Sequence, residues 1–220
     1  MKKIFRKLSV PLSVFYLFVS VMACAPTDTD QQDKALSEAA KLNAKKGVML
    51  FREFQGNENR MFQRLEEGGV TQEMIDEYLV GSGFKAGEVS VETVTEIIQR
   101  IGENQNVSFE DQVNSLEVSS FVKTKLGEIK EAGYIEDLSN QKGFKILPES
   151  EKVLLLNSNE LVNEFNKAAQ DGTVNVPCPN EGCTALMVLA GAGIGTALCG
   201  PVCGVVGGVV GLIIGTSMKP

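Results

Sequence analysis

Residues 184–218 read TALMVLAGAGIGTALCGPVCGVVGGVVGLIIGTSM, and this stretch decides how the chain is expected to fold. It contains nine glycines, two cysteines and one proline, but no charged and no aromatic side chain. The acidic residues all lie earlier, between Asp28 and Glu181. The chain therefore divides into a polar, acidic part and an uncharged apolar segment near its C-terminus.

Small residues recur at every fourth position of the apolar segment. One series comprises Gly191, Gly195, Cys199, Cys203, Gly207, Gly211 and Gly215, and a second comprises Gly200, Gly204 and Gly208. Because residues four apart share one face of a helix, small side chains at this spacing let a second helix approach closely. The spacing predicts a helix-packing stripe, formed by Gly191, Gly195, Gly207, Gly211 and Gly215.

Pro201, in the middle of the segment, predicts two helices rather than one. A single helix of this length would measure about 52 Å, well beyond a hydrocarbon core of about 30 Å, and proline breaks a helix interior. Glycine costs a helix about 1 kcal/mol relative to alanine in water. We therefore expect residues 184–217 to form a membrane-active or membrane-anchoring hairpin of two helices, with membrane lipid or another copy of the chain, in a homo-oligomer, as its partner. A hairpin folded back on the rest of the chain is the alternative.

The N-terminus has the layout of an export signal. Four cations (Lys2, Lys3, Arg6 and Lys7) precede an apolar stretch, as in a secretory signal peptide covering residues 1–23. Val21-Met22-Ala23-Cys24 resembles the lipobox of bacterial lipoproteins, which implies a lipidated Cys24 and a place in the cell envelope, on its periplasmic or cell-surface face. Cleavage after Ala23 without a lipid would instead give a secreted protein, and an uncleaved segment would remain an anchor. Residues 24–33 are expected to form an acidic tether.

The cysteine count agrees with a lipidated Cys24. The other four cysteines are Cys178, Cys183, Cys199 and Cys203, and an even number in an exported protein favours two disulfides with three possible pairings. A zinc site is disfavoured because the residues between the two pairs lack the polar content of a zinc module. No metal is expected.

The body of the chain, residues 34–171, is expected to be an acidic α-helical domain. Residues 33–46 favour helix and Gly47 interrupts it, while Thr71, Ser90 and Ser108 are expected N-caps. Asn157 or Ser158 is expected to cap the last helix. Residues 172–183 are expected to be a linker that carries a cysteine pair. The predicted fold class is all-α: a small helical bundle-like domain followed by a glycine-rich apolar helical hairpin.

Composition argues against several functions. The formal charge is −7 and would be −11 without the four N-terminal cations, so nucleic acid is not an expected partner. The chain has no histidine, and no serine, cysteine or lysine motif supplies a nucleophile with its base. Adjacent carboxylates such as Glu66-Glu67 do not face one another on a helix and favour solvated surface. We expect no enzymatic activity and no cofactor.

The C-terminal segment is similar to the halocin-type bacteriocins, in which a cysteine-flanked, glycine-rich and alanine-rich apolar peptide follows a longer helical precursor. The similarity lies in CTALMVLAGAGIGTALCGPVCGVVGGVVG and the pairs Cys178/Cys183 and Cys199/Cys203. It implies that the C-terminal peptide is the antibacterial part and that the upstream region can protect the producer. The resulting hypothesis is an exported lipoprotein whose disulfide-braced C-terminal segment inserts into membranes, as a bacteriocin-like antibacterial precursor. The alternative is a structural or interaction lipoprotein of the envelope that uses the hairpin as an anchor or oligomerisation element.

Overall fold

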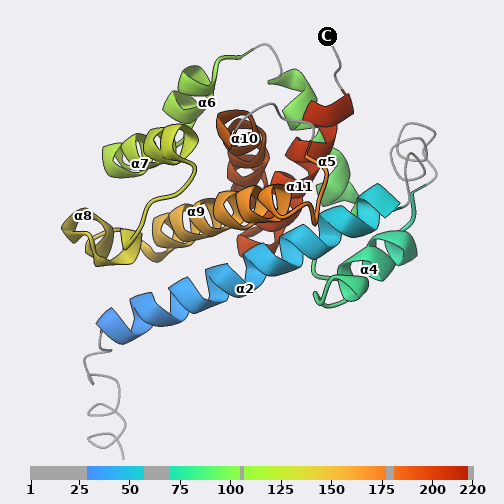
Figure 1. Cartoon of the computed structure of the whole chain (residues 1–220), viewed down its shortest axis with the longest axis horizontal. Helices are drawn as coiled ribbons and strands as arrows, with labels where there is room; N and C mark the ends of the chain where they lie inside the picture. Colours follow the sequence, from blue (N-terminus) through green and yellow to red (C-terminus); the bar gives the residue numbers. More distant parts are fainter. Residues whose placement is uncertain (1–28, 57–69, 105–106, 177–180, 218–220) are drawn as a thin grey trace, which may run out of the picture.

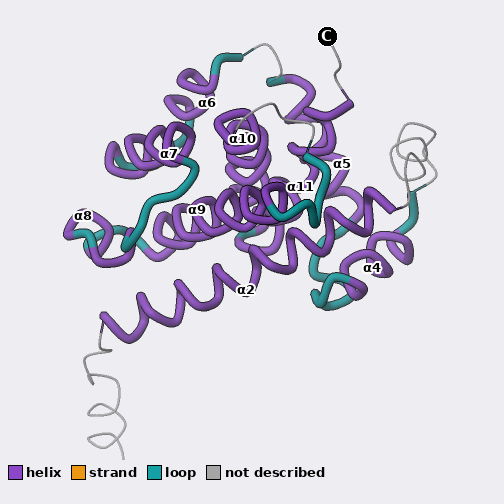
Figure 2. Tube along the Cα trace, viewed as in Figure 1, coloured by secondary structure: helices purple, strands orange, loops and turns teal. Residues whose placement is uncertain are grey.

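The computed structural model describes residues 29–56, 70–104, 107–176 and 181–217, and these residues form an all-α fold without strands. Figure 2 shows the helices joined by short loops. The elements are α2 (Thr29–Gly56), α4 (Gln72–Gly81), α5 (Val91–Glu103), α6 (Phe109–Ser115), α7 (Ser120–Ala132), the 3-10 turn η1 (Leu138–Asn140), α8 (Lys142–Lys145), α9 (Glu149–Gln170), α10 (Glu181–Cys199) and α11 (Pro201–Ser217). The all-α prediction is confirmed.

The apolar hairpin, α10–α11, lies at the centre of this fold. Figure 1 shows α2 and α9 running side by side across the molecule, with α10 and α11 packed against them. Helix α10 also contacts α5 and α7, and α11 also contacts α5. The hairpin had been expected to follow a separate bundle. Instead it supplies the centre of the core, because the other helices have apolar faces that need a partner. Its fully buried side chains include Ala185, Val188, Val205, Val209 and Leu212.

Helix α2 corrects two expectations. It begins at Thr29, so the last residues of the expected tether are helical. It also continues through Gly47 to Gly56. Gly47 does not end the helix because its missing side chain makes room for two others: a Cβ there would lie 2.7 Å from Leu161 Cδ1 and 2.9 Å from Val205 Cγ1. Close packing by distant residues therefore outweighs the low helix propensity of this glycine.

Several of the shorter helices begin directly after a residue whose side chain caps the helix N-terminus. The predicted caps Thr71, Ser90 and Ser108 are confirmed, since each hydroxyl accepts a hydrogen bond from the backbone three residues on. A further cap, Ser119, starts α7, and its hydroxyl accepts from the Val122 N–H. Its backbone N–H and its hydroxyl donate to the Glu151 carboxylate at 3.0 and 2.5 Å, which ties α7 to the first turn of α9.

The expected cap of the last helix, Asn157 or Ser158, is wrong. Helix α9 begins earlier, after Pro148, with Glu149 and Glu151 in its first turn, an arrangement that suits the positive end of a helix. Asn157 and Ser158 instead lie buried in the middle of α9.

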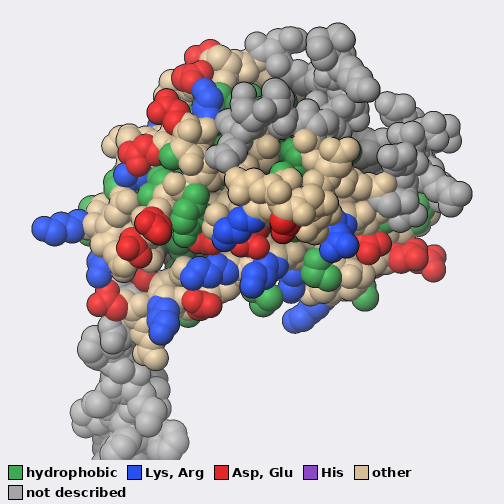
Figure 3. Space-filling view, in the orientation of Figure 1, with side chains coloured by type: hydrophobic (Ala, Val, Ile, Leu, Met, Phe, Trp, Pro, Cys, Tyr) green, Lys and Arg blue, Asp and Glu red, His purple; other side chains and the backbone are tan. Residues whose placement is uncertain are grey.

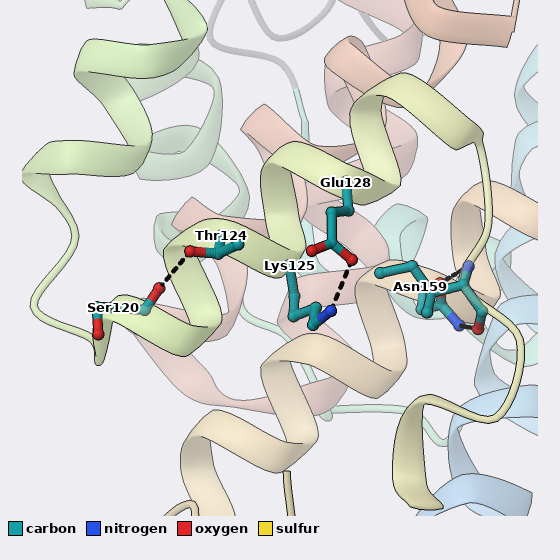
Figure 4. A network of polar contacts seen from close by, with 6 residues as sticks. Ser120, Thr124, Lys125, Glu128 and Asn159 are labelled. Carbon is teal, nitrogen blue, oxygen red and sulfur yellow. Dashed lines mark hydrogen bonds and ion pairs between the residues drawn. The ribbon is translucent and has the colours of Figure 1, made fainter. Parts of the chain in front are cut away.

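The next residue of α9, Asn159, links this helix to the segment that follows α7. Its side-chain oxygen accepts from the Ile135 N–H at 2.8 Å, and its amide group donates to the Ile135 carbonyl at 3.0 Å. Figure 4 shows Asn159 close to the Lys125–Glu128 ion pair of α7. Both polar groups of a buried side chain are thereby satisfied, as a packed core requires.

Glu160 completes this buried polar run, and its ionisation is disfavoured. Burial raises the pKa of the Glu160 carboxyl above 4.5, and Glu164 acts in the same direction. Lys41 of α2, Lys167 and a hydrogen bond from Asn163 lower the pKa but do not offset burial. The folded protein therefore binds a proton at Glu160 more tightly than the unfolded chain does.

We expect Glu160→Gln to raise the free energy of unfolding at neutral pH. A folded-state pKa above that of the unfolded chain means that stability is lost as pH rises from about 4.5 through the folded value. The difference in unfolding free energy between the variant and the unmodified protein should vanish below pH 4.5 and reach its full size above the folded-state pKa of Glu160. Urea unfolding followed by circular dichroism from pH 4 to 8 measures this. Glu164→Gln, which removes the same charge one turn later from an ion pair with Lys167, should give no such gain.

Candidate functional site

Helices α10 and α11 approach each other closely along a surface that we call the glycine seam (Gly191, Gly195, Gly204, Gly207 and Gly211). A Cβ atom added at Gly191 would overlap the Gly207 carbonyl oxygen and lie 2.6 Å from its carbonyl carbon. A Cβ added at Gly207 would overlap the Gly191 carbonyl oxygen in return. The two backbones thus touch directly at this point, which is possible only without side chains.

The seam continues towards both ends of the hairpin. A Cβ at Gly195 would overlap the Cys203 carbonyl oxygen, and one at Gly211 would overlap that of Met187. At Gly204 the space is taken by Thr196, whose buried hydroxyl oxygen has no hydrogen-bond partner among the described groups. The predicted series with a four-residue spacing therefore pairs with itself across the antiparallel hairpin, at Gly191, Gly195, Cys203, Gly207 and Gly211. The side-chain surroundings of Gly215 lie outside the described residues.

Gly208 of the second glycine series has a different role, since it contributes to the contact between the hairpin and the outer helices. A Cβ at Gly208 would lie 2.5 Å from Leu161 Cδ2 and 3.4 Å from Val188 Cγ1. Leu161 of α9 also fills the space at Gly47 of α2, so one side chain packs against glycines of two other helices. The apolar periodicity of the sequence places Leu161 on the buried side of its helix, but it does not identify Gly47 as a packing residue. The position of Gly47 within a helical stretch is the signal in the sequence for its packing role.

The turn between the two helices is closed by backbone geometry and by a disulfide. Gly200 has a φ of +86°, a left-handed conformation that favours glycine, and Pro201 takes the first position of α11, where its missing N–H is not needed. Cys199 and Cys203 are joined by a disulfide across this turn, with Cα atoms 5.6 Å apart. Cys183 is also disulfide-bonded. Cys178 and the lipidation candidate Cys24 lie outside the described residues.

The helices around the hairpin carry the charge. Figure 3 shows lysine, arginine, aspartate and glutamate side chains interspersed over the face that α2 and α9 form. The other outer helices also carry ion pairs, such as Arg100–Glu96 of α5 and Lys130–Glu110 between α7 and α6. The expected linker also belongs to this outer layer, because Val174 is buried and its N–H donates to the Ala168 carbonyl at 3.1 Å. A hairpin that carries no charge from Thr184 onward is thus packed among amphipathic helices with charged outer faces.

One ion pair of the outer helices is buried. The Lys152 ammonium of α9 lies 2.7 Å from Asp33 Oδ1 of α2, and both side chains are less than a tenth exposed. Two exposed contacts lie beside it, from Lys145 to Asp30 and from Gln32 to Glu149. This group fastens the beginning of α2 to the beginning of α9.

The described residues show none of the other kinds of site considered. They contain no group of three or more histidine, cysteine, aspartate or glutamate side chains placed to hold a metal ion. Within the described ranges, no helix has both the length and the apolar character of a membrane-crossing segment. The hairpin with its glycine seam is a candidate functional element because of the backbone contacts described above. Compared with protein-family models, curated proteins and solved structures, the chain matches none of them.

Proposed function

We propose that this protein is an exported bacterial lipoprotein whose hairpin, α10–α11, leaves the surrounding helices and inserts into a membrane, as the active part of a bacteriocin-like antibacterial precursor. The observation that carries the proposal is an uncharged hairpin, closed by its own glycine seam, at the centre of an acidic helical shell. Its charge-free run extends from Thr184 to Met218.

The hairpin is built to move as a unit. Its two helices meet through backbone atoms at Gly191 and Gly207, and the Cys199–Cys203 disulfide closes their turn. These contacts do not involve the outer helices, so they persist if the outer helices separate from the hairpin. Each helix also satisfies its backbone hydrogen bonds internally, which is the requirement for entering lipid. Small residues in close contact are the packing that lipid favours between helices.

The outer helices would keep the hairpin in solution until it meets a membrane. The faces of Val188, Val205, Val209 and Leu212 are buried against the rest of the protein, and exposing them to water would cost about 25 cal/mol per Å² of apolar surface. Lipid removes that cost. Helices α10 and α11 would measure about 28 and 25 Å, from their lengths of 19 and 17 residues at 1.5 Å per residue. Such a hairpin enters the bilayer part way from one side.

A lipid on Cys24 would hold the hairpin and its surrounding helices at the membrane surface. Helix α2 begins at Thr29, so a short segment would connect the lipid to the helical shell. Attachment raises the local concentration of the hairpin at the bilayer and so favours its insertion. One acyl chain alone gives reversible binding, so stable anchoring needs a second chain or another attractive contact with the membrane.

A crosslink between the hairpin and α2 tests insertion. Val205 Cγ1 lies 2.9 Å from the position of a Cβ at Gly47, and in a disulfide each sulfur lies about 3 Å from the opposite Cβ. The double variant Gly47→Cys/Val205→Cys should therefore form a disulfide once the Leu161 methyl group, 2.7 Å from the same Cβ position, rotates away. We expect the unmodified oxidised protein to release dye from vesicles of phosphatidylethanolamine and phosphatidylglycerol, and the crosslinked variant to release none.

The controls use the same residues. Each single cysteine variant should retain dye release, and peptide mapping should show that the Cys199–Cys203 bond is kept. Equal release by crosslinked and unmodified protein would contradict hairpin movement, and no release at any protein-to-lipid ratio would contradict membrane disruption. Oligomers that form on vesicles without dye release would instead support the alternative of an assembly element. In the folded protein the seam is already occupied within one chain, so such oligomers would also need the hairpin to be released.

Export and lipidation are tested separately at Cys24. When the full chain is expressed in bacteria, we expect the mature protein to begin at a lipidated Cys24 and to sediment with membranes. Cys24→Ala should shift the protein out of the lipid-modified fraction, which mass spectrometry and metabolic labelling with a fatty acid both report. A mature N-terminus at Cys24 with a free thiol would contradict the lipoprotein assignment but leave export intact.

A further inference from the structure

A cavity of about 250 Å³ lies between the hairpin and the region where α5 is followed by α6. A smaller cavity of about 70 Å³ shares several of its lining residues. The apolar part of the larger cavity is formed mainly by Ile101, Phe109, Leu186, Met187, Ala190 and Ile194. None of the residues that line either cavity is charged. An ionised ligand group would therefore find no partner inside.

Asn104, Ser108 and Gln112 contribute the polar part of the lining of the larger cavity. The Ser108 hydroxyl donates to Asp111 Oδ2 and accepts from the Asp111 N–H, and the orientation of the two amide side chains follows from their hydrogen bonds. The Gln112 amide nitrogen donates to the Asn104 and Val107 carbonyl oxygens at 3.1 and 2.9 Å. The Asn104 side-chain nitrogen donates to the Arg100 carbonyl at 2.8 Å. Carbonyl partners require the nitrogen of each amide to face them. In the described part of the chain, no hydrogen bond is donated to Gln112 Oε1 or Asn104 Oδ1, so both oxygens keep their capacity to accept.

We propose that this cavity binds a neutral, unbranched alkyl or acyl chain whose head group donates a hydrogen bond, such as a fatty alcohol or a fatty amide. Apolar walls bind the chain and the two amide oxygens accept from the head. A cavity of about 150 Å³ holds a six-carbon ring, and on that scale the larger cavity accommodates about ten carbon atoms. The interior is too small for a helix of a partner protein, whose diameter with side chains is about 10 Å.

The position of the cavity gives such a ligand a structural effect. Ile101 and Gln112 belong to the outer helices α5 and α6, whereas Met187 and Ala190 belong to α10. A chain bound between them contacts both parts and binds only while they are together. Its binding therefore stabilises the closed arrangement and raises the melting temperature with ligand concentration. This binding does not depend on whether the hairpin enters membranes.

A titration of the full protein with 1-octanol and with octanoate tests the site and its preference for a neutral head. Methyl resonances of Ile101, Ile194 and Ile214 should shift saturably with 1-octanol, while those of the remote Ile75 and Ile146 should not. Octanoate at pH 8 should bind at least about tenfold more weakly, because its carboxylate has no cation in the lining. Non-saturable shifts, shifts spread over all methyl groups, or equal affinity for octanoate would overturn the proposal.

A matched pair of variants on α10 completes the test. Ala190→Phe fills the cavity and should abolish the octanol-induced rise in melting temperature. Ala197→Phe places the same ring at an exposed position of the same helix and should leave that rise unchanged. Retained octanol binding in folded Ala190→Phe would place the ligand elsewhere. The methyl titration of the unmodified protein decides the question even if the filled variant does not fold.

Discussion

Replacing Gly191 with alanine should lower the free energy of unfolding by about 1–3 kcal/mol, the usual range for inserting a group into a packed core. The new Cβ would overlap the Gly207 carbonyl oxygen and lie 2.6 Å from its carbonyl carbon. Both atoms belong to a helix backbone, so no side chain can rotate away to make room. The two helices would have to separate, and the contacts along the seam would weaken together. This loss exceeds the gain of about 1 kcal/mol that alanine brings to a helix interior.

The control lies two residues further along the same helix. A Cβ at Gly193 would meet nothing within 4 Å, so Gly193→Ala should raise stability by up to about 1 kcal/mol through helix propensity alone. Urea unfolding followed by circular dichroism measures both variants. Opposite signs for two identical substitutions would establish that the seam, rather than glycine content, governs stability. A stabilised Gly191→Ala variant would mean that α10 and α11 do not touch there.

Local chemistry explains which parts of the fold the sequence predicted well. Ser90 and Ser108 cap helices through hydrogen bonds within three residues. Gly200 and Pro201 define the hairpin turn by their own backbone preferences. Each of these features depends on a few neighbouring residues, so the sequence pattern contained them.

The errors arise where distant residues decide. Helix α2 continues through Gly47 because Leu161 and Val205 fill the space that a side chain at Gly47 would take. Those two residues are far away in the sequence. Ser158 has the chemistry of a helix cap but lies buried within α9, since Pro148 and the acidic residues after it start that helix earlier. A residue type that suits a cap does not reveal whether a better start lies one or two turns before it.

The location of the hairpin has the same explanation. The spacing of Gly191, Gly195, Gly207 and Gly211 predicted that helices approach closely, and the structure places these glycines between α10 and α11. The same spacing is compatible with a partner in lipid, in another chain or in the same chain. The hairpin is enclosed because α2, α5 and α9 have apolar faces that pack against it. The glycine spacing within the hairpin gives no information about those faces.

Removing the Asp33 carboxylate should cost about 3–5 kcal/mol of stability, because a buried lysine would lose its partner. The Lys152 ammonium lies 2.7 Å from Asp33 Oδ1, with side-chain exposures of 8% and 5%. Lys152 also lies over the Phe144 ring at 5.5 Å, an interaction too weak to replace a carboxylate. In Asp33→Ala the ammonium must therefore remain unpaired or the ends of α2 and α9 must separate. Either change lowers the midpoint of urea unfolding at pH 7.

Two companion variants separate the loss of the ion pair from other effects of the substitution. Asp30→Ala removes a carboxylate from the same helix end, where Asp30 pairs with Lys145 in an exposed position, and solvent screening should leave stability unchanged. Asp33→Leu/Lys152→Met removes both buried charges and should recover most of the stability lost in Asp33→Ala, since an apolar pair of similar volume has no desolvation cost. A double variant as unstable as Asp33→Ala would show that the aspartate stabilises α2 by another route. In that case Asp33 Oδ2, which is buried without a hydrogen-bond partner among the described groups, would be the atom to examine next.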